Sequence, residues 1–273
     1  MARKSYRVKF AGGDGLSQLA GIIDRPDDVA TPPVVVYSHC FTCNKDLKST
    51  VRVSRGLSEL GVAVLRFDMM GLGGSEGDFS SSNFTTNLAD LSAAIRFASA
   101  EMGTVTGLMG HSFGGAASLA IAADNPNDDL PPIQAVASLA APSDTTHLAD
   151  LLESMNPAIQ STGVGDVTIG GFQWTIRREM LGDFRQYDLP KYIAQIACPV
   201  LLMHSPVDQT VRFDHALRIM SLINGSPHLN SPVSLLSLDQ ADHLLANDQR
   251  DVNFVASSAA AFFHRFCDTG RGM

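Results

Sequence analysis

The stretch from Val105 to Ala120 constrains the fold of this chain more than any other. It reads VTGLMGHSFGGAASLA: an apolar run, a turn flanked by glycines and a run of small residues. The apolar run predicts a buried strand and the small residues predict a helix. Gly110 and Gly114 stand two residues before and two after Ser112, where only glycine leaves room for the neighbouring strand and helix. We therefore expect a tight strand-to-helix turn with Ser112 at its tip.

Apolar runs and helical segments alternate along most of the chain. An N-terminal hairpin is predicted first, and it is followed by alternating strands and helices with one interruption. The predicted strands are 5–10, 18–23, 33–38, 62–67, the run before Gly110, 134–139, 200–203 and 233–238; the predicted helices are 45–60, 83–100, the run after Ser112, 213–223 and 251–266. Continuous apolar strands alternating with helices indicate an α/β fold, with a mostly parallel sheet covered on both faces.

The interruption lies between residues 142 and 190. About fifty residues stand there between two core strands, where a crossover needs only about a dozen. We interpret the chain as one domain, 1–273, with 142–190 as a lid; a helical excursion that only packs on the sheet is the alternative. The apolar residues of the lid that we expect to line a substrate pocket are Phe172, Trp174, Ile176 and Met180.

Composition limits the function classes. Hydrophobic residues make up 45% of the chain and charged residues 18%, as in globular proteins with a sizeable core. A net charge of −8 without a Lys/Arg-rich run argues against nucleic acid as a partner. There is neither a run of about 18 apolar residues nor an apolar stretch behind the basic N-terminus, so we expect no membrane span, no secretory signal and a cytoplasmic location.

Four cysteines are too few for a disulfide scaffold, so free thiols are expected at Cys40, Cys43, Cys198 and Cys267. Cys40 and Cys43 nevertheless form a CxxC pair between a strand and a helix, where a redox pair would lie. A structural metal site needs four ligands, and no second cluster of suitable spacing exists. We expect no metal and no cofactor, and interpret the pair as small residues that shape a loop; a CxxC redox protein is an alternative.

Ser112 needs a base and an acid to become a nucleophile, because a serine hydroxyl reacts poorly at neutral pH. Asp208 and His243 follow two predicted strands, at the sheet edge where open α/β folds bind ligands. The predicted catalytic residues are therefore Ser112, Asp208 and His243. Asp144, after another strand, is the alternative to Asp208, and the side chain of His111 is expected to point away from the tip of the turn.

An acyl-transfer site also needs two main-chain N–H groups for the developing oxyanion. We assign them to Phe113, directly after the serine, and to Phe41, in the loop after strand 33–38. Residues 71–77 do not complete a GxGxxG dinucleotide motif, because Glu76 stands where glycine is needed. They are interpreted as a rim loop whose turns Asp68 and Ser75 hold.

Five segments together resemble the α/β-hydrolase superfamily over residues 33–266. These are HCF (39–41), RFDMMGLGGSEG (66–77), GHSFGG (110–115), HSPVDQTV (204–211) and DQADHLL (239–245). Residues 38–79 and the words MHSPVDQTV resemble the hydrolase domain that some bacterial proteins carry fused to an OsmC-type domain. One departure is Cys40, where many relatives have glycine, and we expect as a second that no OsmC-type domain is attached. The resemblance implies an esterase-like serine hydrolase.

The predicted activity is hydrolysis of small-molecule carboxylic esters of small to medium acyl chain through an acyl-enzyme. The same three residues serve thioesterases, lactonases and amidases, and fold alone does not choose among them. A non-catalytic binding module of the same fold is a further alternative. A homodimer is the expected assembly.

Overall fold

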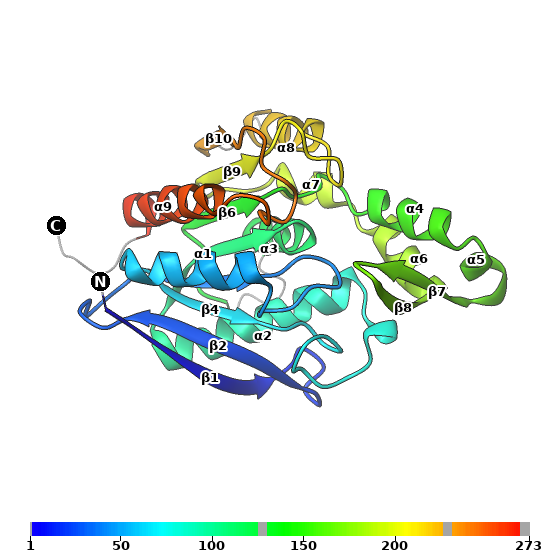
Figure 1. Ribbon diagram of the computed structural model, residues 1–273, viewed down its shortest axis with the longest axis horizontal. Helices are drawn as coiled ribbons and strands as arrows, with labels where there is room; N and C mark the ends of the chain where they lie inside the picture. Colours follow the sequence, from blue (N-terminus) through cyan, green and yellow to red (C-terminus); the bar gives the residue numbers. More distant parts are fainter. Residues whose placement is uncertain (1, 125–129, 226–230, 268–273) are drawn as a thin grey trace.

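An eight-stranded sheet forms the centre of the computed structural model, which describes residues 2–124, 130–225 and 231–267. The strands lie in the order β1-β2-β4-β3-β5-β6-β9-β10 (Figure 1). Their bounds are β1 (Arg3–Ala11), β2 (Gln18–Pro26), β3 (Val34–Ser38), β4 (Ala63–Phe67), β5 (Val105–His111), β6 (Ala135–Leu139), β9 (Val200–His204) and β10 (Val233–Ser237). Strands β1 and β2 form an antiparallel hairpin, β2 also pairs antiparallel with β4, and the remaining pairs are parallel.

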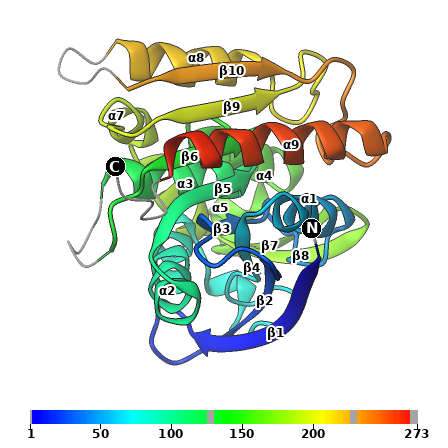
Figure 2. The ribbon, with the colours of Figure 1, turned by 90° about the vertical axis from the view of Figure 1, so that its left-hand side faces the viewer.

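Helices cover both faces of this sheet (Figure 2). Alternate residues of β3 face opposite sides: Val34 and Val36 lie in the apolar cluster that includes α2 and α3, whereas Val35 and Tyr37 lie in the cluster that includes α1 and α9. The helices are α1 (Lys48–Glu59), α2 (Phe84–Met102), α3 (Phe113–Ala123), α8 (Asp214–Asn224) and α9 (Gln249–Phe266). Because β3 is buried on both faces, it reads as the continuous apolar run that predicted it. The predicted α/β-hydrolase fold is confirmed.

The segment between β6 and β9 adds a lobe at the end of the molecule remote from the N-terminus (Figure 1). The lobe contains α4 (Thr146–Met155), α5 (Ala158–Thr162), β7 (Val164–Ile169), β8 (Phe172–Arg177) and α6 (Arg178–Gln186). The last helix of the segment, α7 (Leu189–Ile193), packs on α3 and α8 of the main body. Strands β7 and β8 form a separate antiparallel pair. The lobe is tied to the main sheet layer at the N-terminus of α2, where Asp183 accepts the N–H of Phe84 at 2.8 Å. No helix in the described ranges is long and apolar enough to cross a membrane.

Candidate active site

The turn that carries Ser112 joins β5 to α3 and has an unusual backbone. Ser112 has φ 54° and ψ −119°, outside the regions that residues with a side chain favour. A Cβ on Gly110 would lie 2.1 Å from the carbonyl oxygen of Gly114, and one on Gly114 would lie 2.4 Å from the carbonyl oxygens of Ser38 and His39. The glycine spacing therefore permits close backbone approach, as the sequence predicts, and the predicted strand, turn and helix are confirmed.

This backbone conformation makes a prediction about stability. Ser112→Gly is expected to raise the free energy of unfolding by about 1 kcal/mol relative to Ser112→Ala, because glycine adopts a positive φ without a Cβ clash. Urea unfolding of the two variants measures this difference. A glycine variant that is equally stable or less stable would mean that the turn stores no strain.

Asp208 and His243 form a hydrogen-bonded pair beyond the ends of β9 and β10. His243 Nδ1–H donates to Asp208 Oδ2 at 2.7 Å. Oδ1 of Asp208 accepts the main-chain N–H groups of Thr210 at 2.8 Å and Val211 at 3.0 Å. Burial alone would raise the pKa of Asp208, but the hydrogen bond and charge of His243, together with these N–H groups, hold it below its ordinary value. The carboxylate is therefore ionised at neutral pH and suited to orient an imidazole.

His111 joins this pair to the serine turn. It is 1% exposed, and its Nε2–H donates to the main-chain carbonyl oxygen of His243 at 2.7 Å. The His111 and His243 rings lie 5.1 Å apart between centroids. Because His111 precedes Ser112 in the chain, His243 is anchored at the serine turn. The sequence analysis assigns no role to His111. The one sequence feature that could have indicated this contact is a histidine at the end of an otherwise apolar strand.

The Ser112 hydroxyl makes no hydrogen bond to His243 among the residues that the structure describes. Such contacts are often long in free enzymes and tighten when substrate binds. Ser112 is 8% exposed and the side chain of His243 is 11% exposed, so both groups lie at the edge of the protein interior.

The prediction of four free thiols is wrong for two of them, because Cys40 and Cys43 form a disulfide. The residues between them make a tight turn in which the N–H of Cys43 donates to the carbonyl oxygen of Cys40 at 3.1 Å, and Thr42 has φ 57°. This turn brings the two Cα atoms to 5.2 Å, within the range that a disulfide spans. Cys198 and Cys267 are free and buried, and burial raises the pKa of their thiols to about 12 and about 11.

Phe41 lies inside this disulfide-closed turn. Neither its N–H nor that of Phe113 has an acceptor within the described ranges of the chain. The rings of Phe41 and Phe113 lie 5.5 Å apart between centroids, and the first turn of α3 approaches the backbone of Ser38 and His39 closely at Gly114. Two free N–H donors thus belong to segments in direct contact. Their role as oxyanion donors stays a prediction.

Buried polar contacts hold the Phe41 turn in place. His39 Nδ1–H donates to the Cys40 carbonyl oxygen at 2.8 Å, and its Nε2 accepts the N–H of Met69 at 3.1 Å. Asp68 accepts the ammonium of Lys45 at 2.8 Å and the N–H of Gly74 at 2.7 Å. Residue 68 therefore links Lys45, which follows the Phe41 turn, to the rim loop, where the Ser75 hydroxyl donates to the carbonyl oxygen of Asp68 at 2.7 Å. The predicted hold of Asp68 and Ser75 on the turns of residues 71–77 is confirmed, and their place at the rim of the site stays a prediction.

A second serine–histidine pair follows β6. The Oγ atom of Ser143 lies 2.9 Å from His215 Nδ1, a hydrogen bond of the kind that a triad contains. The N–H of Ser143 donates to the same nitrogen at 3.1 Å, so that nitrogen is an acceptor. Asp144 pairs with Arg218 at 2.7 Å, and Asp208 is the carboxylate bonded to His243. Ser143 is fully buried, whereas Ser112 retains some exposure.

The residues predicted to line a substrate pocket have different surroundings. Phe172 is 70% exposed, whereas Ile176 and Met180 are buried in the hydrophobic core. Trp174 packs against Phe79, with 4.9 Å between ring centroids, and Phe79 lies 5.5 Å from the ring of Phe41. A row of aromatic rings thus connects the inserted lobe to the Phe41 turn.

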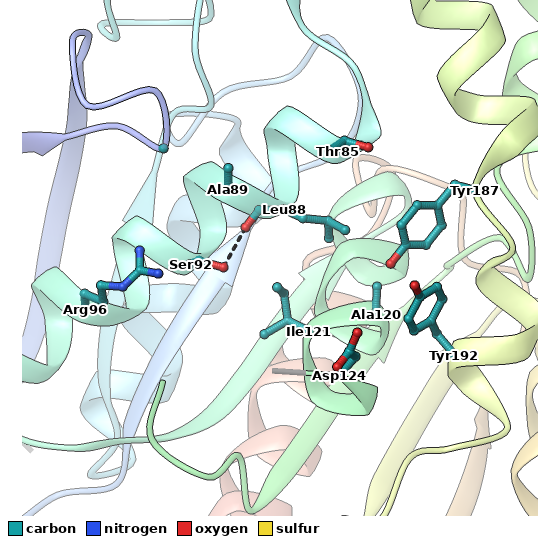
Figure 3. Close-up of a pocket in the computed structure, with 11 residues that line it drawn as sticks. Thr85, Leu88, Ala89, Ser92, Arg96, Ala120, Ile121, Asp124, Tyr187 and Tyr192 are labelled. Carbon is teal, nitrogen blue, oxygen red and sulfur yellow. Dashed lines mark hydrogen bonds between the residues drawn. The ribbon is translucent and has the colours of Figure 1, made fainter. Parts of the chain in front are cut away.

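A cavity of about 340 Å³ lies elsewhere, between α2, α3 and α7 (Figure 3). Tyr187 and Tyr192 form one wall with stacked rings, and Leu88 and Ile121 face them. None of Ser112, Asp208 and His243 lines it. Within the described ranges, no group of three or more His, Cys, Asp or Glu side chains is arranged to hold a metal ion.

The sheet order, the serine turn after β5 and the Asp–His pair after β9 and β10 define an α/β hydrolase. A family model described as serine aminopeptidase, S33, matches residues 34–165. The esterase domain of a Rhodothermus marinus protein is 37% identical, with a TM-score of 0.74, and the match covers 96% of this chain and 99% of that one. The chain therefore belongs to the α/β-hydrolase family and is esterase-like.

Two more distant solved structures share the fold. Est1E from Butyrivibrio proteoclasticus, with ferulic acid bound, has a TM-score of 0.77 at 20% identity, over 95% of this chain and 99% of that chain. The esterase Pf2001 from Pyrococcus furiosus has a TM-score of 0.70 at 18% identity, over 97% and 92% respectively. No curated protein matches the sequence.

Proposed function

We propose that the protein is a serine hydrolase that cleaves carboxylic esters of small to medium acyl chain through an acyl-enzyme. The observation that carries this proposal is the Asp208–His243 hydrogen bond, anchored by His111 one residue from the strained Ser112. A positive φ at a single residue, supported on both sides by glycines, is a costly conformation that is typical of functional sites.

In this mechanism Ser112 Oγ attacks the ester carbonyl while His243 Nε2 accepts its proton. Asp208 fixes the tautomer of the imidazole and stabilises its charged form. The N–H groups of Phe41 and Phe113 bind the oxyanion of the tetrahedral intermediate. Collapse of the intermediate breaks the bond to the alcohol, which takes the proton from His243. Water then attacks the acyl-enzyme by the same route and releases the acid.

We propose residues 142–190 as a lid over this site, with Phe172, Trp174, Ile176 and Met180 toward the substrate. The aromatic contacts from Trp174 through Phe79 to Phe41 support this, because they join the lobe to the loop of a proposed oxyanion donor. A small-molecule ester as the substrate agrees with the small carboxylic acid, ferulic acid, bound to the similar protein Est1E, since ester hydrolysis releases a carboxylic acid. The same proposal includes membership of the subgroup related to OsmC-fused hydrolases. It also includes a cytoplasmic location and a homodimer.

A fluorophosphonate probe tests the proposal, because it modifies only an activated serine. Wild-type protein is expected to be labelled at Ser112, Ser112→Ala to take up no probe, and Ser143→Ala to be labelled normally. Peptide mapping of the adduct identifies the serine. Labelling at Ser143 would transfer the nucleophile to the second serine–histidine pair, and an unlabelled wild-type protein would favour the binding module.

Substrate class is tested with acyl esters of graded chain length and with the thioester, lactone and amide of the preferred acyl group. Hydrolysis is expected to be fastest for short and medium esters. The redox alternative is tested by reducing the Cys40–Cys43 disulfide with a dithiol. If the protein is an esterase, it should still hydrolyse esters after this reduction and without a redox partner. A redox protein would instead exchange disulfides with substrate thiols and leave esters intact.

A further inference from the structure

We infer that His111 is a positioning residue that sets the place of His243 relative to Ser112. The inference deepens the proposed acyl transfer and rests on it. It assigns a role to the residue between Gly110 and Ser112, which the glycine–serine spacing leaves open.

His243 is held at two separate atoms. Its ring is fixed by the bond to Asp208 at 2.7 Å, and its main-chain carbonyl oxygen accepts Nε2–H of His111, also at 2.7 Å. The first bond sets the rotation and tautomer of the imidazole. The second sets where the chain that carries the imidazole lies. Only the second comes from β5, whose last residue precedes Ser112.

Ala241 and Leu245 bury the loop that carries His243 against the core, but among the described residues no second hydrogen bond joins this loop to the serine turn. Residues 240 and 245 have positive φ angles of 58° and 52°, so the chain is irregular on both sides of His243. Asp242 accepts the N–H groups of Ala246 and Asn247, each at 2.8 Å, which fixes the internal shape of the loop. These bonds stay within the loop and do not set its distance from Ser112.

His111 is suited to this role by its rigidity. It is the last residue of β5, where it pairs with Leu139 of β6, and its side chain is buried. A carbonyl oxygen accepts only, so Nε2 carries a proton. Burial lowers the pKa of His111 to about 3, so the ring is neutral and adds no positive charge beside His243. A neutral donor thus holds the base without opposing the imidazolium that forms during catalysis.

The test compares two substitutions of similar size. Gln places a side-chain N–H near the position of Nε2, whereas Leu fills the space without a donor. His111→Leu is expected to lower kcat about 10-fold to 100-fold with KM nearly unchanged, since a displacement of about 1 Å costs up to about 10²-fold in rate. His111→Gln is expected to retain most of the wild-type kcat. Thermal unfolding shows whether both variants are folded.

The pattern separates positioning from packing and from failure of the proposed function. If Leu and Gln variants lose activity equally, or neither loses it, the inference is overturned. If His111→Leu is too unstable to assay, His111→Asn replaces it, because the shorter amide of Asn does not reach the carbonyl oxygen of His243. The test then compares kcat and the rate of fluorophosphonate labelling between His111→Gln and His111→Asn. Should wild-type protein take up no probe, the proposed function fails before His111 is tested.

Discussion

Replacing Ser112 by alanine is expected to lower kcat for the preferred ester by about 10⁶-fold, the loss typical of removing the nucleophile of a serine triad. Alanine keeps the Cβ atom and the same backbone preference, so the turn between β5 and α3 should persist. KM should change little, because the acyl pocket is untouched. Steady-state kinetics with a chromogenic aryl ester measure the loss of kcat. The activity of a mock-purified extract sets the lowest rate that can be assigned to the variant.

Ser143→Ala is the matched control for this experiment. Ser143 also bonds to a histidine, but its N–H and its hydroxyl both meet the same nitrogen of His215. Because Nδ1 of His215 already accepts a hydrogen bond from the main-chain N–H of Ser143, it is poorly placed to receive the proton of the serine hydroxyl. We expect Ser143→Ala to retain most of its activity. A large loss in Ser143→Ala with a small one in Ser112→Ala would contradict the assignment.

Much of this fold could be predicted because its central strands are buried on both faces. Residues 34–38 and 63–67 have no exposed side chain, so no polar alternation weakens the apolar signal. The serine turn was predictable for a related reason: Gly114 approaches the backbone of Ser38 within a distance that no Cβ permits. Because only glycine meets this steric requirement, the residue type at position 114 can be recognised in the sequence.

Other features depend on distances that spacing does not encode. Free thiols were expected at Cys40 and Cys43 from cysteine number alone, but the turn at Thr42, with its positive φ, brings the two cysteines together. The bond from His111 to His243 spans 132 positions in the chain and ends on a main-chain oxygen, to which any residue type contributes equally. Contacts to the main chain leave no pattern at the accepting position.

The inserted lobe shows a third limit. The sequence predicts Phe172, Trp174, Ile176 and Met180 as pocket lining, and Ile176 and Met180 are also buried in the core that holds the lobe to the rest of the protein. Apolar character serves packing and substrate binding alike, so composition does not separate them. Trp174 and Phe172 are the two that keep exposed surface.

Asp208→Asn is the substitution with the second largest expected effect, a fall in kcat of about 10⁴-fold. The side-chain amide would be oriented by its neighbours: the N–H groups of Thr210 and Val211 require an acceptor, so the amide oxygen takes the place of Oδ1. The amide NH₂ then faces His243 Nδ1. That nitrogen must accept instead of donate, so the proton moves to Nε2 and the base loses its site for the serine proton.

Asp144→Asn tests whether the loss is specific to this carboxylate. Asp144 pairs with Arg218 at 2.7 Å on a partly exposed site, and such pairs contribute at most about 1 kcal/mol. We expect its variant to keep most of its activity. In Asp208→Asn, the fluorophosphonate should react slowly with Ser112 while urea unfolding stays close to wild type, because the fold and nucleophile remain and only the tautomer changes. Normal turnover in Asp208→Asn would show that His243 does not depend on Asp208, and the proposed triad would be wrong.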